Sequence, residues 1–174
     1  MKIPTYIMIH HTLVSYKKND DQFRANNIYH KNKWNFKSSL GYYLGYNYEI
    51  SAKGKVRQAR KDGEKTAAAY QDNMNDGRAI HIALDGNFDI EKPLPAQIFA
   101  LRDLLRKLVE KYKIPKSNIV FHRDYAPKTC PGNNMDINFI RSLIKEQNII
   151  DTKNEIKQEI FNLLDNLKSL IKKL

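Results

Sequence analysis

Residues 3–12 read IPTYIMIHHT. This short apolar run, rich in Ile and Tyr, predicts a buried strand. The strand carries two adjacent histidines, His10 and His11, to its C-terminal end, where α/β folds usually place their chemistry. Adjacent strand residues point to opposite faces of a sheet, so only one of the two imidazoles can enter a given site. The segment therefore predicts an α/β sheet with one histidine directed into a site at its edge.

A second segment, residues 122–132, reads HRDYAPKTCPG. It contains His122 and the only cysteine of the chain, Cys130, on a loop kinked by Pro127 and Pro131. A lone thiol cannot form an intrachain disulfide, so its value lies in packing, reactivity or metal ligation. A histidine in the same loop favours ligation.

One histidine of the first segment, together with His122 and Cys130, makes a His, His, Cys set. Three ligands of this kind suit zinc and leave the fourth tetrahedral position open, as in catalytic rather than structural sites. Taken singly, strand histidines and a loop cysteine are more often packed or exposed residues than ligands. The spacing alone does not establish that these positions meet in space.

Three segments in this order, IMIHHT (7–12), KWNFKSSLGYYLGYNYEISAKGKV (33–56) and HRDYAPKTCPG (122–132), resemble the zinc-dependent N-acetylmuramoyl-L-alanine amidases. That family includes the amidase-type phage lysins and the catalytic peptidoglycan recognition proteins. The likeness covers residues 1–147. It implies a catalytic domain over that range and a mixed central sheet flanked by helices, an α/β fold.

The resemblance also implies roles for individual residues. The implied ligands of a Zn²⁺ cofactor are His10, His122 and Cys130, with His11 on the opposite face of the strand. Tyr46, in GYNY, and Lys128, two residues before the cysteine, match catalytic residues of the family. The chain departs from many members at Asn47, where they carry histidine, and at residues 66–70, TAAAY, where they carry a His-Ala pair.

The implied reaction is hydrolysis of the amide bond between N-acetylmuramic acid and L-alanine in bacterial peptidoglycan, as in an endolysin or autolysin. Zinc lowers the pKa of a bound water toward about 7 and polarises the lactyl carbonyl. Lys128 is expected to stabilise the tetrahedral oxyanion, and Tyr46 to position the water or to hydrogen bond the oxyanion. On residue type alone, Lys128 reads as a solvated lysine among 30 Lys and Arg, and Tyr46 as a packed aromatic among ten tyrosines.

Local patterns predict the remaining elements. His81 lies in a predicted strand and is expected to be a packed or rim residue rather than a ligand, and Trp34 is left outside the predicted site. Asp136 is expected to cap the last helix of the domain. The predicted elements are a helix over 20–34, a hairpin over 44–60 turning at Gly54, a strand over 79–86, an amphipathic helix over 95–112 and a strand over 117–121.

Residues 148–174 differ in kind from the rest, because they carry an uninterrupted heptad pattern. On a helix, the apolar residues of this pattern form a continuous stripe, which must pack on the domain or on copies of itself. We expect an amphipathic helix that makes a homo-oligomer, with docking on the domain as the alternative. A membrane-surface helix is disfavoured because the polar face mixes acids with lysines. The core positions are Ile149, Ile156, Ile160, Leu163, Leu167, Leu170 and Leu174, with Lys153 in the remaining slot.

The formal net charge is +11, and nearly all of it lies in residues 1–148, the body of the chain. Such an excess attracts polyanions, whether nucleic acid or the anionic polymers of a bacterial wall. No nucleic-acid-binding motif accompanies it, so we expect peptidoglycan and no specific nucleic acid as partner. Two other classes stay open: a non-hydrolytic peptidoglycan-binding module, and a basic regulator that binds nucleic acid or a polymerase.

No apolar run approaches the roughly 20 residues of a membrane span. The N-terminus also lacks a basic region followed by an apolar stretch and a cleavage site. We therefore expect synthesis in the cytoplasm without a signal peptide, and action on the cell wall after release.

Overall fold

The computed structural model describes residues 2–144 together with residues 157, 160 and 161. The predicted heptad helix over 148–174 therefore lies outside the described residues, apart from those three positions. Among the described residues, no helix combines the length and the apolar character that a bilayer span requires.

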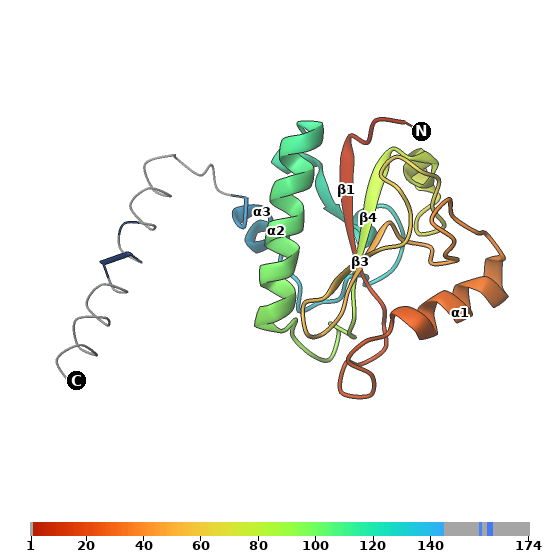
Figure 1. The fold of residues 1–174 in the computed structure, drawn as a ribbon, viewed down its shortest axis with the longest axis horizontal. Helices are drawn as coiled ribbons and strands as arrows, with labels where there is room; N and C mark the ends of the chain where they lie inside the picture. Colours follow the sequence, from red (N-terminus) through yellow and green to blue (C-terminus); the bar gives the residue numbers. More distant parts are fainter. Residues whose placement is uncertain (1, 145–156, 158–159, 162–174) are drawn as a thin grey trace, which may run out of the picture. The chain divides into compact units, whose positions relative to one another are not determined.

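The domain is built on a five-stranded mixed sheet with the strand order β3-β2-β4-β1-β5 (Figure 1). β1 is parallel to both of its neighbours, β4 and β5, and β2 is parallel to β4. β2 and β3 form the antiparallel hairpin predicted around Gly54. The strands are β1 (Tyr6–His11), β2 (Tyr48–Ile50), β3 (Val56–Gln58), β4 (Ala79–Leu84) and β5 (Ile119–Phe121). The predicted α/β class with a mixed central sheet is confirmed.

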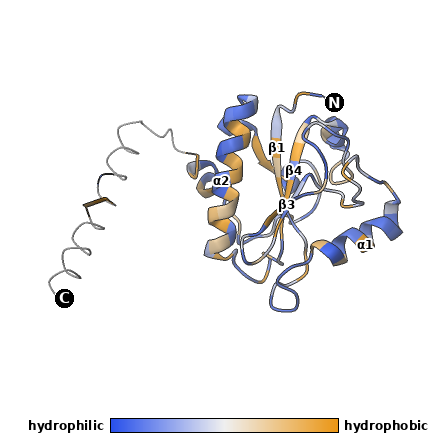
Figure 2. Ribbon diagram, in the orientation of Figure 1, coloured by the Kyte–Doolittle hydropathy of each residue, from blue (hydrophilic) through white to orange (hydrophobic). Residues whose placement is uncertain are grey.

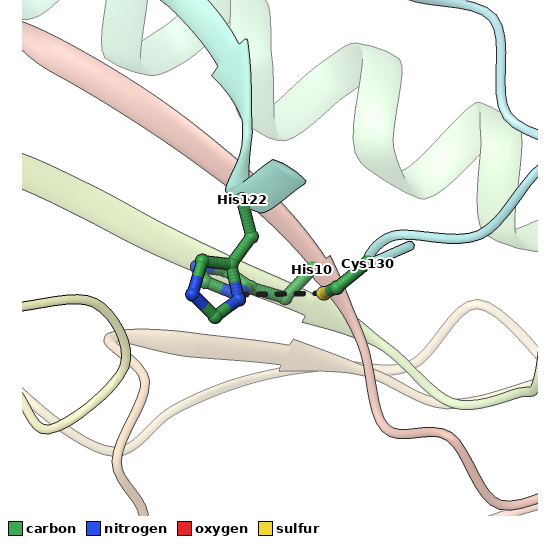
Figure 3. A group of neighbouring side chains, drawn as sticks. All are labelled: His10, His122 and Cys130. Atoms are coloured by element: carbon green, nitrogen blue, oxygen red, sulfur yellow. Dashed lines mark hydrogen bonds between the residues drawn. The ribbon is translucent and has the colours of Figure 1, made fainter. Parts of the chain in front are cut away.

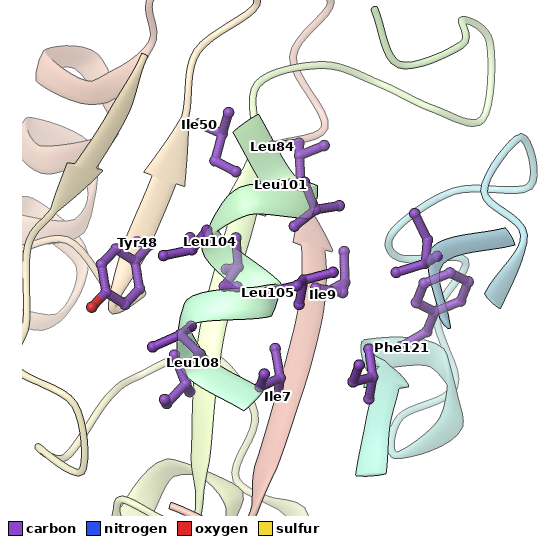
Figure 4. Close-up of a cluster of buried hydrophobic side chains, with 14 of the residues drawn as sticks. Ile7, Ile9, Tyr48, Ile50, Leu84, Leu101, Leu104, Leu105, Leu108 and Phe121 are labelled. Carbon is purple, nitrogen blue, oxygen red and sulfur yellow. The ribbon is translucent and has the colours of Figure 1, made fainter. Parts of the chain in front are cut away.

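One face of the sheet is covered by α2 (Pro95–Tyr112), which has the predicted bounds (Figure 4). Proline at the first helical position and a left-handed residue, Lys113, after the last turn explain where α2 begins and ends. Each fully buried leucine contributes about 1.5–3 kcal/mol of transfer free energy. The leucines of α2 that pack into this core are Leu101, Leu104, Leu105 and Leu108.

The opposite side of the sheet faces α1 (Phe23–Trp34), which is mainly hydrophilic and buries only Phe23 and His30 (Figures 1 and 2). The predicted helix over 20–34 thus starts three residues later than expected. The last helix of the domain, α3 (Ile137–Ser142), is capped as predicted, because a carboxylate oxygen of Asp136 accepts a hydrogen bond from the Asn138 backbone N–H at 2.8 Å. Short 3-10 turns complete the domain at Gln71–Asp76, Lys116–Asn118 and His122–Asp124.

The register of the parallel strands decides which side chains share a face. His10 of β1 is opposite Ala83 of β4, which in turn is opposite Glu49 of β2. These three positions therefore point to the α1 side of the sheet. Ile7 and Ile9 alternate with them and point into the core under α2.

Two buried carboxyl groups lie next to each other on the α1 side, Glu49 on β2 and Asp85 just after β4. Asp85 accepts a hydrogen bond from the Gln22 backbone N–H at 2.7 Å, and Glu49 accepts one from the Asn26 amide at 2.9 Å. The other oxygen of each group has no donor. Burial raises the pKa of Asp85 to about 6 and that of Glu49 well above its usual range. We infer that Glu49 and Asp85 share one proton, which occupies the two oxygens that have no other donor.

This pair predicts a pH dependence of stability. Because the folded pKa values lie above the unfolded ones, the stabilisation is complete below the unfolded pKa of about 4 and is lost as pH rises through the folded values. Glu49→Gln replaces the shared proton by an amide N–H. As the pH rises, the free energy of unfolding of this variant should therefore fall by about 1–2 kcal/mol less than that of the wild type. Urea unfolding between about pH 5 and pH 8 measures this. Glu110→Gln, at an exposed carboxyl of α2, is the control, and parallel profiles for wild type and Glu49→Gln would contradict the shared proton.

Candidate metal centre

Two adjacent parallel strands bring His10 and His122 together. His10 is the fifth residue of β1, and His122 directly follows β5. Ile9 and Phe121 are partners in the parallel ladder, so the residue after each stands at the same edge of the sheet. The two imidazole centroids lie 4.7 Å apart (Figure 3).

The loop that contains Cys130 is held by Arg123 at the cysteine itself and on its C-terminal side. The Arg123 backbone N–H donates to the Cys130 carbonyl at 2.8 Å, and its guanidinium donates to the Gly132 and Met135 carbonyls. Gly132 has a φ of +109°, and a Cβ there would lie 2.3 Å from the Phe88 carbonyl carbon, so glycine is required. The loop is therefore fixed with the thiol facing His10.

The three predicted ligands converge. The Sγ atom of Cys130 lies 3.7 Å from Nδ1 of His10, and one donor atom from each of His10, His122 and Cys130 lies within 4.8 Å of the others. In tetrahedral zinc sites, Zn–N bonds of about 2.0–2.1 Å and Zn–S bonds of about 2.3 Å separate the donors by roughly 3.3–3.6 Å. The type, number and spacing of these donors therefore fit zinc with one coordination position left open.

Burial controls the protonation of the three groups. It lowers the pKa of His10 well below the ordinary value, with His122 and His81 adding to the effect, and it lowers the pKa of His122 to about 4. Burial also raises the pKa of the Cys130 thiol to about 11, against the opposing effects of the His11 backbone N–H and the Lys128 charge. The imidazoles are thus neutral and able to ligate, whereas the thiol must release its proton when it binds a metal.

Two of the three donors, His122 and Cys130, line a cavity of about 630 Å³ whose wall also includes the two predicted catalytic residues. The half-buried Tyr46 ring lies 5.1 Å from the His10 ring, centroid to centroid. Burial raises the pKa of Tyr46, so its phenol remains protonated. Lys128 is exposed and also lines the cavity.

Part of the cavity wall was not predicted. Trp34 lines it together with His30, and their rings stack with centroids 4.6 Å apart. The His30 ring is fixed because its Nδ1 accepts the Gly45 backbone N–H at 3.1 Å. Trp34 is the only tryptophan, but nothing in its local sequence shows that α1 ends beside the metal-ligand group.

The other two histidines near the site lie where the sequence predicted. The His11 ring is on the opposite face of β1 from His10, where its Nδ1 accepts the Phe88 backbone N–H at 3.2 Å, and His11 also lines the cavity. His81 is completely buried and does not belong to the donor group. Its hydrogen bond with His10, at 2.9 Å, was not predicted.

The fold and the donor group together define an α/β protein with a mixed sheet and an open His, His, Cys site at the carboxyl ends of its parallel strands. The sequence profile of the N-acetylmuramoyl-L-alanine amidase family matches residues 1–133, and the chain belongs to that family. Peptidoglycan-recognition protein SC2 of Drosophila simulans is 31% identical over 137 residues, which cover 75% of this chain and 70% of that protein.

Solved structures agree with this assignment. The N-acetylmuramoyl-L-alanine amidase LysC from Clostridium intestinale URNW is 29% identical, with a TM-score of 0.63 over 80% of this chain and 84% of that one. The Ph2119 endolysin from the Thermus scotoductus MAT2119 bacteriophage Ph2119 has a TM-score of 0.66 at 20% identity, over 84% and 88% of the two chains. The latter likeness shows the shared fold.

The neighbouring histidines of β1 offer a matched test of the metal centre. We expect the wild-type chain to hold one zinc ion and His10→Asn to lose at least nine tenths of it, because an amide does not replace the imidazole donor. His11→Asn should keep the metal, since its amide oxygen can accept the Phe88 N–H in place of the imidazole. Elemental analysis after dialysis measures both. Equal zinc in the two variants would show that His10 is not a ligand.

Proposed function

We propose that this chain is a zinc-dependent amidase that hydrolyses the bond between N-acetylmuramic acid and L-alanine in bacterial peptidoglycan, as an endolysin or autolysin does. The observation that carries the proposal is the convergence of His10, His122 and Cys130 within 4.8 Å, with His122 and Cys130 at the wall of a cavity. Support comes from the family match and from LysC, a solved structure named as such an amidase.

Zinc held by these donors would supply a Lewis acid for the lactyl carbonyl and a water that ionises near neutral pH. The chain supplies the rest of the chemistry. Tyr46 beside His10 keeps its phenol proton and can donate a hydrogen bond to the carbonyl oxygen as charge develops there. Lys128, on the same cavity, adds a positive charge that favours the oxyanion. The proton required by the departing L-alanine amine comes from one of these two groups or from the attacking water.

Recognition without hydrolysis is the second candidate, and the names of the peptidoglycan-recognition relatives support it. In the amidase-like proteins that this chain resembles, members without the cysteine bind but do not cut. Cys130 is present here, and its thiol faces His10 at 3.7 Å. The complete donor group therefore favours hydrolysis. For a nucleic-acid or polymerase-binding regulator, the sequence offers only its charge of +11.

The remaining parts of the proposal concern the organisation and location of the protein. Residues 1–147 form the catalytic domain, and residues 148–174 form the oligomerisation helix. The basic body increases attraction to the anionic polymers of the wall. The protein acts on the cell wall after release from the cytoplasm.

The catalytic assignments predict graded losses of activity. Cys130→Ala should abolish the release of muropeptides without unfolding the domain, and a chelator should do the same to the wild type. Lys128→Met and Tyr46→Phe should keep zinc but lower kcat by about 10²–10³, the usual effect of removing one oxyanion donor. Mass spectrometry of digested peptidoglycan identifies the bond cut, with Glu110→Gln, at an exposed carboxyl of α2, as the active control. Normal hydrolysis by Cys130→Ala would exclude the metal mechanism.

The proposed role of the C-terminal segment predicts a change of mass. Truncation after residue 148 removes the heptad pattern, so the shortened chain should be a smaller, soluble species by light scattering. Its activity on soluble wall fragments should be retained, because the site residues all precede the cut. If the number of chains per particle stays the same, the segment is not an oligomerisation helix.

A further inference from the structure

His10 is connected to a second buried histidine by a chain of hydrogen bonds. Nε2 of His10 lies 2.9 Å from Nδ1 of His81, and Nε2 of His81 lies 3.2 Å from the Met74 carbonyl oxygen. His10 is 1% exposed, and His81 and Met74 are 0% exposed, so water does not satisfy these groups. Nδ1 of His10, the remaining ring nitrogen, is the atom that faces the Cys130 thiol.

The Met74 carbonyl, at the end of these hydrogen bonds, determines which ring nitrogen of His81 and of His10 carries the proton. A carbonyl oxygen can only accept, so a neutral His81 carries its proton on Nε2 and donates it to Met74. Its Nδ1 is then an acceptor, which requires His10 to carry its proton on Nε2. The Nδ1 lone pair of His10 is left free and directed toward the donor group. His81 is 0% exposed, and its two ring nitrogens contact only His10 and the Met74 carbonyl, so no carboxylate among the described residues is present to stabilise a charged imidazole.

From this geometry we propose that His81 is a positioning residue: together with the Met74 carbonyl, it fixes the ring orientation and the tautomer of His10 in which Nδ1 is free to ligate a divalent metal. The part of this inference that concerns zinc rests on the proposed function. The part that concerns the tautomer rests on the hydrogen bonds alone. Such outer-shell partners of metal-binding histidines increase ligand basicity and set ring orientation.

His81 is itself held rigidly, as a positioning residue must be. It lies in β4, where its backbone N–H donates to the Asn47 side-chain oxygen at 2.8 Å and its carbonyl accepts the Asn47 N–H at 3.0 Å. Asn47 therefore fixes the strand position of His81. This contact gives a physical role to a residue at which the chain departs from many amidases.

The acceptor at the other end is fixed as well. Met74 lies in the 3-10 segment Gln71–Asp76, and its side chain is fully buried. The following residue, Asn75, accepts hydrogen bonds from the backbone N–H groups of Ala68 and Ala69 through its side chain, at 2.8 and 2.7 Å. We call the hydrogen bonds from His10 through His81 to the Met74 carbonyl the relay. His81 and the Met74 segment are thus both tied to the fold independently of the metal-ligand group.

Two substitutions of nearly equal size separate positioning from packing. In His81→Asn, the amide oxygen takes approximately the place of Nδ1 and can accept from His10. In His81→Leu, the shape is similar but no acceptor remains. We expect His81→Leu to weaken zinc binding about 10–100-fold and His81→Asn to stay within about threefold of the wild type. Competition with a chromogenic chelator measures the dissociation constants, and thermal unfolding confirms that both variants are folded.

A second measurement reads the tautomer directly and does not need the metal. Long-range ¹⁵N–¹H NMR of the metal-free wild type should show both His10 and His81 protonated on Nε2. His81→Asn should keep the Nε2–H form of His10, whereas His81→Leu should give a mixture. If His81→Leu fails to fold, the wild-type and His81→Asn spectra still decide the question.

The outcomes of the two measurements are distinguishable. A wild-type chain that binds no zinc, but has both imidazoles protonated on Nε2, would refute the proposed function and uphold the relay. A wild-type His10 protonated on Nδ1 would overturn the relay whatever the zinc affinity is. Equal zinc affinities in His81→Leu and the wild type, with zinc bound normally, would overturn the positioning role.

Discussion

The parallel pairing of β1 with β4 on one side and β5 on the other is the constraint on which the site depends. It places the carboxyl ends of three strands at one edge, so that His10 and His122 meet there although 112 positions separate them in the sequence. It also sorts adjacent side chains, with His10 toward the donor group and His11 away from it. A slip of one residue in the register of β1 would exchange the directions of His10 and His11. It would also turn Ile7 and Ile9 out of the core under α2. The burial of the core therefore keeps the metal ligand in place.

Much of the fold is predictable because its signals are local. The spacing of the α2 leucines, the proline at its start, the turn at Gly54 and the cap at Asp136 each act within a few residues. The two ligand segments are recognisable because they carry unusual residue types, and the family likeness supplies their partnership. The exception is the start of α1, where the sequence suggests an acidic helix start but the first helical residue is Phe23.

Two of the unpredicted contacts depend on strand order. His81 meets His10 because β4 is the neighbour of β1, and Glu49 meets Asp85 because β2 pairs with β4 across a long connection. No spacing rule in a single sequence gives those neighbours. The stacking of Trp34 on His30 is local, but its place on the cavity wall depends on where α1 ends relative to the sheet.

The α1 side of the sheet shows how buried polar groups near the candidate site are kept in defined states. On β4, His81 ends its relay at a carbonyl. Glu49 on β2 and Asp85 just after β4 accept hydrogen bonds from the Asn26 amide and the Gln22 N–H, and we infer that the remaining two oxygens share one proton. In both cases, the partner determines the position of a proton, and hence which atoms remain free. His81 is such a partner for the donor His10, whereas Glu49 and Asp85 lie outside the donor group. The three-donor site therefore depends on satisfied neighbours as well as on the donors themselves.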